Sequence, residues 1–363
     1  MKIVTVVGAR PQFIKAAVVS AEFKKISNLE EVIIHTGQHY DSKMSDIFFK
    51  EMDIPEPKHF LRINNASHGE MTGHMLIEIE KILLDEQPDL VLLYGDTNST
   101  LAGALAAVKL KIKIAHVESG LRNHDLTIPE EVNRVFADSV SSIVYYPTDL
   151  ALQNLIDEGY DKKNGTLLVR SGDIMEDAAY MFREHMVWPV DVPLNSGDKF
   201  VLATLHRAGN TDDAGRLENI VDGINRVHAV TPVVLPIHPR TAKRLKELNI
   251  RLDAHTIEPV GYFEMLSLLD KCQMVLTDSG GVQKESYFFN KVSLIFADYS
   301  PWKELVDAGY NVLVDDCPEL IFSAFSDNTG RVIEKVENFY GGGEARHVIV
   351  DSILDYLGVI ESC

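Results

Sequence analysis

Cysteine is scarce in this chain, and the three cysteines that occur, Cys272, Cys317 and Cys363, form no C-x-x-C pair. An odd number of widely separated cysteines argues against a disulfide framework and a thiolate zinc site, and is typical of a reducing compartment. Long apolar runs are also missing near the N-terminus, where residues 3–7 are too few for a signal peptide or a membrane span. The sequence therefore predicts a cytoplasmic protein that does not bind membranes.

Basic residues are also few relative to acidic residues. The chain has 35 Lys and Arg against 54 Asp and Glu, which gives a formal net charge of −19 at pH 7. This balance argues against non-specific nucleic-acid binding, so an anionic ligand would need a local cluster of cations or helix N-termini. The first predicted turn lacks the G-x-G-x-x-G and G-K-[ST] patterns, and no histidine pair matches H-E-x-x-H. We therefore predict no nicotinamide, no metal and no other cofactor.

The chain does contain short β-branched runs that alternate with helical patterns, which is typical of βαβ units on a parallel sheet. The predicted strands lie at 2–7, 31–35, 90–94, 112–117 and 142–146, and then at 200–204, 232–236, 274–277 and 292–295. A chain of 363 residues exceeds the usual size of one core. We therefore expect an α/β protein of two Rossmann-like, doubly wound domains facing a cleft, formed by 1–170 with a C-terminal helix at about 347–363, and by 171–346.

Residues that follow the strands are candidate site residues, because open parallel sheets bind ligands beyond the carboxyl ends of their strands. Arg10 and Lys15 follow the first strand and are placed to meet an anion. Ser279, Gly280 and Gly281 end a later strand and open a helix, where backbone amides and a hydroxyl suit a phosphate.

Glu285 follows one helical turn later. It is either a ribose ligand or a solvated helical carboxylate.

Carboxylates occupy three equivalent positions in the first predicted domain, at Asp96, Glu118 and Glu130. Carboxylates that converge in a cleft have separated pKa values and work as acid and base. Taken singly, Asp96 is equally a capping residue, and Glu130 a charge that favours the helix dipole. His206 and His238 follow strands of the second domain, where each lines the cleft or serves a structural role.

Nine motifs together indicate a family: GARPQFIK, TGQHYD, YGDTNST, HVESGLR, PEEVNR, TLHRAGN, HPR, VGYFEML and DSGGVQKE. In this order they resemble the non-hydrolysing UDP-N-acetylglucosamine 2-epimerase family, over nearly the whole chain. The resemblance implies a GT-B-like fold, a homodimer and a UDP-sugar substrate for synthesis of cell-surface polysaccharide sugars. In that reaction UDP leaves, a glycal forms, and both return with C2 inverted. The segments GARPQFIK, HGEMTG and TLHRA are most similar to members that act on UDP-2,3-diacetamido-2,3-dideoxyglucuronate, which makes this sugar nucleotide or UDP-N-acetylglucosamine the expected substrate.

The resemblance also implies residue roles. The acid/base candidates are Asp96, Glu118 and Glu130. The groups that stabilise the departing charge are Arg10, His206, Ser279 and Gly280. The uridine and ribose ligands are Gly261, Tyr262, Phe263 and Glu285, with Lys15 and Gly281 in the same UDP-binding set. Positions that bind a second, activating UDP-sugar in some members are Gln38, His39 and His238.

Two departures from the family pattern stand out. Gly209 replaces the usual Glu of H-R-A-E-N, and Ala297 lies in F-A-D-Y-S-P-W where the family has a segment resembling R-D-x-T-E-W. These changes predict either altered sugar selectivity or the joint loss of a structural contact. The alternatives to a non-hydrolysing epimerase are a GT-B glycosyltransferase, a hydrolysing 2-epimerase and a non-catalytic UDP-sugar sensor.

Overall fold

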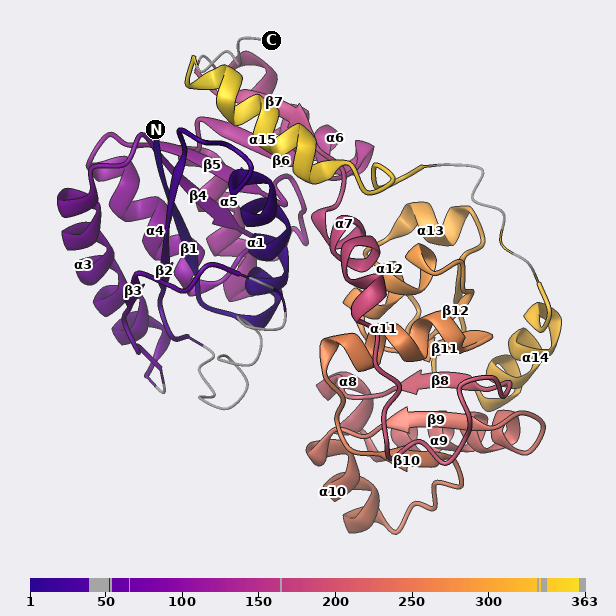
Figure 1. Ribbon diagram of the computed structural model, residues 1–363. Helices are drawn as coiled ribbons and strands as arrows, with labels where there is room; N and C mark the ends of the chain where they lie inside the picture. The colour runs from indigo at the N-terminus through magenta and orange to yellow at the C-terminus, as the bar shows by residue number, and fades with distance from the viewer. Residues whose placement is uncertain are drawn as a thin grey trace. The chain divides into compact units, whose positions relative to one another are not determined.

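The computed structural model describes residues 1–38, 52, 54–64, 66–163, 165–331, 333 and 338–358. The chain divides into two compact units (Figure 1). The first unit comprises Met1–Met181 and Asn338–Cys363, and the second comprises Phe182–Glu337. No helix in the described part of the chain combines the length and the apolar character of a membrane span.

The first unit is built on a parallel sheet of seven strands in the order β3-β2-β1-β4-β5-β6-β7. Its strands are β1 (Lys2–Val7), β2 (Glu30–His35), β3 (His59–Phe60), β4 (Leu90–Tyr94), β5 (Lys113–Val117), β6 (Ile143–Tyr146) and β7 (Leu167–Arg170). The strand order reverses between β1 and β4, which is where such folds bind ligands.

Helices cover both faces of this sheet, so β4 is buried along its whole length. The helices are α1 (Arg10–Phe23), α3 (His68–Glu86), α4 (Asn98–Lys109), α5 (Pro129–Val140), α6 (Asp149–Asp157), α7 (Ile174–Met181) and α15 (Ala345–Tyr356), with a 3₁₀ turn at Tyr160–Lys162. Apolar side chains of α3, α4 and α5, such as Met75, Ala104 and Ala137, form one core with β1 and β4. On the other face, α1 packs with α7 and α15.

The first unit extends to Met181, beyond the expected end at residue 170, because α7 packs against α1 and α15. The buried Asp177 carboxylate accepts hydrogen bonds from the backbone amides of Ala345 and Arg346, each at 3.0 Å. These bonds join α7 to the first turn of α15. The chain therefore re-enters this unit at residue 338, before the helix expected at about 347–363.

The second unit repeats the same topology, with six parallel strands in the order β10-β9-β8-β11-β12-β13. Its strands are β8 (Val201–Thr204), β9 (Val233–Pro236), β10 (His255–Ile257), β11 (Met274–Thr277), β12 (Ser293–Ile295) and β13 (Asn311–Leu313). Its helices are α8 (Ala208–Thr211), α9 (Ala214–His228), α10 (Pro239–Leu248), α11 (Tyr262–Lys271), α12 (Gly280–Phe288), α13 (Lys303–Asp307) and α14 (Pro318–Asn328), with a 3₁₀ turn at Phe182–His185. Two doubly wound α/β sheets confirm the predicted fold class.

Candidate active site

The turn between β1 and α1 is held by Gln12, a residue that the sequence interpretation did not single out. Its Oε1 accepts the amide of Gly8 at 2.8 Å, and its Nε2 donates to the carbonyl oxygen of Tyr94 at 2.7 Å. A Cβ atom at Gly8 would lie 2.1 Å from the hydroxyl oxygens of both Ser99 and Thr36. The turn therefore needs glycine at position 8, and Gln12 ties the ends of β1 and β4 together at the switch point.

Lys15 contacts the carboxylate of Glu118, at the end of β5, as an ion pair. Both side chains are largely buried, with 8% and 17% of their surfaces exposed. Gly95 lies against this pair, since a Cβ atom there would be 3.3 Å from Oε2 of Glu118 and 3.6 Å from Nζ of Lys15. Lys15, expected to meet an anionic ligand, thus meets a protein carboxylate, whereas Arg10 is half-buried at the first position of α1.

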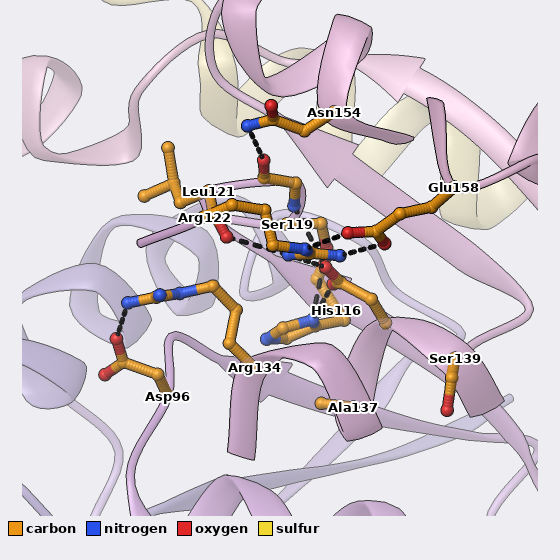
Figure 2. A network of polar contacts seen from close by, with 12 residues as sticks. Asp96, His116, Ser119, Leu121, Arg122, Arg134, Ala137, Ser139, Asn154 and Glu158 are labelled. Carbon is orange, nitrogen blue, oxygen red and sulfur yellow. Dashed lines mark hydrogen bonds and ion pairs between the residues drawn. The ribbon is translucent and has the colours of Figure 1, made fainter. Parts of the chain in front are cut away.

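Asp96, which follows Gly95, contacts the guanidinium of Arg134 on α5 (Figure 2). Arg134 also bonds Glu131 at 2.5 Å, and Asn133 donates to the backbone carbonyl of Asp96 at 2.9 Å. Burial raises the pKa of Asp96, and the negative charge of Glu118 raises it further, while Arg134 and Lys15 oppose the shift. A carboxyl group with a raised pKa beside an ionised one suits proton exchange.

Glu130 is exposed in the first turn of α5, whereas the adjacent Glu131 is buried. Glu131 accepts hydrogen bonds from the backbone amides of Asn123 and His124, each at 3.0 Å. Among the described residues, Glu131 rather than Glu130 is linked to Asp96, through Arg134. The spacing of Glu131 and Arg134, three residues apart on a predicted helix, is the signal in the sequence that could have found this pair.

In the second unit, the buried Asp278 organises the turn after β8. Its carboxylate accepts the backbone amides of His206 at 3.0 Å and Arg207 at 2.8 Å, and Oδ1 lies 3.3 Å from the imidazole Nδ1 of His206. Asp278 directly follows β11, so it ties the ends of two neighbouring strands together. The sequence interpretation missed Asp278, although it immediately precedes Ser279.

The start of α12 carries the predicted phosphate-binding residues. Ser279 is the N-cap, and its hydroxyl accepts the amide of Val282 at 3.4 Å. A Cβ atom at Gly280 would lie 3.2 Å from Nη2 of Arg207, so this guanidinium lies at the helix N-terminus. Arg207 was not among the predicted residues, although it follows His206 directly. Together they place backbone amides, a hydroxyl and a cation where an anion would be stabilised.

Gly281 and Glu285 lie further along α12, where Gly281 is exposed and Glu285 is half-buried. A carboxylate with exposed surface at this position remains able to reach a ligand bound at the helix start.

Gly261, Tyr262 and Phe263 begin α11. The amide of Gly261 donates to the carboxylate of Glu264 at 2.7 Å. Only 7% of Tyr262 and 9% of Phe263 are exposed, because both rings pack near Phe182, with centroid distances of 6.2 and 5.6 Å. The protein therefore covers most of the surface of these two rings.

Two of the residues expected at a second ligand site, Gln38 and His238, form hydrogen bonds within the protein. Oε1 of Gln38 accepts the amide of Ser99 at 3.1 Å and its hydroxyl at 2.9 Å. His238 is exposed and caps α10, where its Nδ1 accepts the amide of Arg240 at 3.2 Å. His39 lies outside the described residues.

Comparison with known proteins identifies the family. Residues 21–354 match the model of the UDP-N-acetylglucosamine 2-epimerase family. The chain belongs to this family. The predicted relationship is confirmed, and so is the predicted class of enzyme, since homologues of the chain are UDP-sugar 2-epimerases, which are carbohydrate isomerases.

Two curated relatives span nearly all of the chain. UDP-2,3-diacetamido-2,3-dideoxy-D-glucuronate 2-epimerase of Pseudomonas aeruginosa is 49% identical over 352 residues, covering 97% of this chain and 99% of the relative. UDP-N-acetylglucosamine 2-epimerase of Methanocaldococcus jannaschii is 40% identical over 368 residues, covering 98% and 99%.

A solved structure of the Methanocaldococcus jannaschii enzyme, in complex with UDP-GlcNAc and UDP, aligns with a TM-score of 0.82 and 40% identity over 98% of this chain and all of that one. The UDP-GlcNAc 2-epimerase of Neisseria meningitidis bound to UDP-GlcNAc has a TM-score of 0.83 at 28% identity, covering 98% of this chain and 100% of that chain. The alignments with these two 2-epimerase structures therefore span both units of the chain.

Gly209 and Ala297 are the two departures from the 2-epimerase family pattern. A Cβ atom at Gly209, on α8, would meet no atom within 4 Å. Ala297 follows β12 and is half-buried, with its amide donating to the carbonyl of Ile295 at 2.8 Å. The space at Gly209 shows that glycine is not required there by packing.

Proposed function

We propose that this protein inverts C2 of a UDP-linked 2-acetamido sugar and keeps the sugar attached to UDP. The main support for the proposal is the pair Asp96 and Glu118, which lie beyond the carboxyl ends of β4 and β5 in the first sheet. Each contacts a buried cation, and Asp96 has a pKa raised by burial. Two acidic groups with unlike environments are what removal and return of a proton require.

The proposed reaction has two steps, elimination of UDP and its return. A carboxylate takes the C2 proton while the bond between C1 and the phosphate oxygen breaks, so the electrons of the C2–H bond form the C1=C2 double bond and UDP leaves as an anion. UDP then attacks C1 of the glycal, and a carboxyl group delivers a proton to the other face of C2. We propose Asp96, Glu118 and Glu130 as candidates for these transfers.

We propose that the second unit binds the nucleotide. The helix N-terminus at Ser279 and Gly280, with Arg207 and His206 beside it, supports binding of the diphosphate. Arg10 is a further candidate for stabilising the departing charge. Candidate contacts with the ribose and base are Glu285, Gly281, Gly261, Tyr262 and Phe263. Candidate residues for a second UDP-sugar are Gln38, His39 and His238.

The proposed substrate is UDP-2,3-diacetamido-2,3-dideoxyglucuronate, with UDP-N-acetylglucosamine as the second candidate. The 49% identity to the Pseudomonas aeruginosa enzyme named for the former sugar supports this order. We further propose that the enzyme acts in the cytoplasm as a homodimer and supplies sugars for cell-surface polysaccharide. Light scattering of the purified protein tests the dimer, and cell fractionation tests the location.

Proton NMR in deuterium oxide tests the function, with each UDP-sugar incubated separately. We expect deuterium at C2 and a product of inverted C2 configuration still bound to UDP. Free sugar with released UDP would indicate a hydrolysing 2-epimerase, and transfer to an added acceptor would indicate a glycosyltransferase. Binding of UDP-sugar without exchange at C2 would indicate a sensor and overturn the proposal.

A further inference from the structure

Glu118 has a backbone conformation that glutamate rarely adopts. Its φ is 72°, in the left-handed region, directly after the end of β5. A residue other than glycine keeps such a conformation only where the surrounding structure holds it, and such residues gather at functional sites. The contacts that hold the backbone on either side of Glu118 therefore also place its carboxylate.

One carboxylate holds both sides of this segment, residues 116–122, which we call the Glu118 loop. Asp138 on α5 is fully buried, and its Oδ1 lies 2.7 Å from Nδ1 of His116. Its Oδ2 accepts the amide of Gly120 at 3.0 Å and Nη1 of Arg122 at 2.8 Å. Asp138 thus bonds the loop before Glu118, after it, and at its far end.

Arg122 continues this network towards α6. Its side chain is 1% exposed, and it donates to both carboxylate oxygens of Glu158, through Nε at 2.6 Å and Nη2 at 2.8 Å. These charge-assisted, paired hydrogen bonds fix the guanidinium firmly. Removing the carboxylate of Asp138 would take away the acceptor of the Gly120 amide and leave Glu158 as the remaining carboxylate partner of Arg122, so the loop could not simply keep its geometry.

His116 links the Glu118 loop to the turn that carries Asp96. Its Nε2 lies 2.7 Å from the carbonyl oxygen of Gly95, and the amide of Gly95 donates to the carbonyl of Val117 at 3.0 Å. Both ring nitrogens of His116 thus lie within hydrogen-bond distance of oxygen atoms. The buried imidazole of His116 therefore connects Asp138 to Gly95, the residue before Asp96.

We propose that His116 and Asp138 are positioning residues, which hold Glu118 and Asp96 at the spacing that proton transfer at C2 requires. The inference rests on the proposed epimerase function. Both side chains are fully buried, so they act through Glu118 and Asp96 and not on the sugar. A misplacement of about 1 Å at reacting groups costs about 100-fold in rate, which sets the size of the effect.

Two substitutions at position 116 separate its two bonds. In His116→Gln the side-chain nitrogen reaches the position of Nε2 and can still donate to Gly95, whereas in His116→Asn it reaches the position of Nδ1 and can still donate to Asp138. Asp138→Asn replaces one of the two carboxylate oxygens that bond the Glu118 loop. We expect kcat and C2 exchange to fall about 10- to 100-fold in His116→Asn and Asp138→Asn, and less in His116→Gln. KM should change by less than about 2-fold, because both substituted side chains are fully buried and neither is a proposed nucleotide ligand.

Glu86→Gln is the matched control, because Glu86 is also a buried carboxylate with cationic partners, at the opposite edge of the same sheet. Thermal unfolding is measured for every variant. The proposal is overturned if Asp138→Asn and His116→Asn keep kcat within about 2-fold of the control, or if their lost activity returns in full once assays are run below their unfolding transitions. An inactive wild-type enzyme would instead refute the proposed function.

Discussion

At the scale of the residue, Asp278 decides how the second unit presents its candidate ligands. The Oδ2 atom of Asp278 accepts the amide of Arg207, and its Oδ1 atom lies near the amide and Nδ1 of His206, whereas asparagine has one acceptor oxygen. We expect Asp278→Asn to lower stability by about 1–3 kcal/mol and to weaken UDP binding by about 10-fold. Titration calorimetry with UDP and thermal unfolding measure both effects.

The control for this prediction is Asp307→Asn, which removes an exposed ion pair with Lys303. It should leave both the unfolding temperature and UDP affinity unchanged. Equal UDP affinity in Asp278→Asn and the control would contradict the role given to Asp278.

Glycine is required at position 8 by close approach alone. Gly8→Ala would bring a methyl group within 2.1 Å of two buried hydroxyl oxygens, on Ser99 and Thr36. We expect a loss of about 1–3 kcal/mol in the free energy of unfolding, measured in urea. Gly209→Ala is the matched substitution with open space, and it should cost nothing. Similar losses in both variants would contradict crowding at the switch point as the cause.

At the scale of the element, Glu86 joins the end of α3 to the strands beside it. Its carboxylate lies 3.0 Å from Lys2 of β1, and it contacts His59 of β3 at 2.7 Å. Hydrogen bonds from Lys58 and His59 lower the pKa of Glu86 from 4.5 to about 2. A carboxyl group whose pKa falls on folding stabilises the fold in its ionised form.

The pH dependence of the free energy of unfolding follows from the lowered pKa of Glu86. The contribution of Glu86 is complete above pH 4.5 and is lost as the pH falls towards 2. We expect wild-type protein to lose stability relative to Glu86→Gln across this interval, in urea unfolding at pH 7, 4 and 3. Glu78→Gln, which removes an exposed pair with Lys81, should show no such trend. A constant difference between wild type and Glu86→Gln would contradict the prediction.

The sequence predicted the central strands well and the outer strands poorly. β4 is an unbroken apolar run because both faces are buried, and β1, β4 and β11 have the bounds that their patterns indicate. The edge strands β3, β7, β10 and β13 are two to four residues long and contain polar or charged residues. Such segments are strands only because a neighbouring strand supplies their hydrogen bonds, which no local pattern reports.

At the scale of the whole molecule, the two units differ in how the chain builds them. Residues 182–337 are continuous and contain a complete six-stranded sheet, whereas the first unit needs α15 from the far end of the chain. We expect the fragment 182–337 to unfold cooperatively and to bind UDP. The fragment 1–181 should be much less stable, because it lacks the fully buried Ile349 and Ile353 of α15. Circular dichroism on heating and UDP titration test both, and a fragment 182–337 without a cooperative transition would contradict the prediction.

The sequence by itself determined the fold class and the family, because buried parallel strands are apolar over their length and the residues at strand ends form recognisable ordered motifs. It did not determine which polar residues meet. Asp96, His116 and the α5 residues Arg134 and Asp138 come from three separate segments. They are joined because β1, β4 and β5 lie side by side in parallel register and α5 packs beside them. Contacts between residues so far apart in the chain depend on strand order and helix packing, so only the tertiary structure could decide that Glu131, and not Glu130, is tied to Asp96.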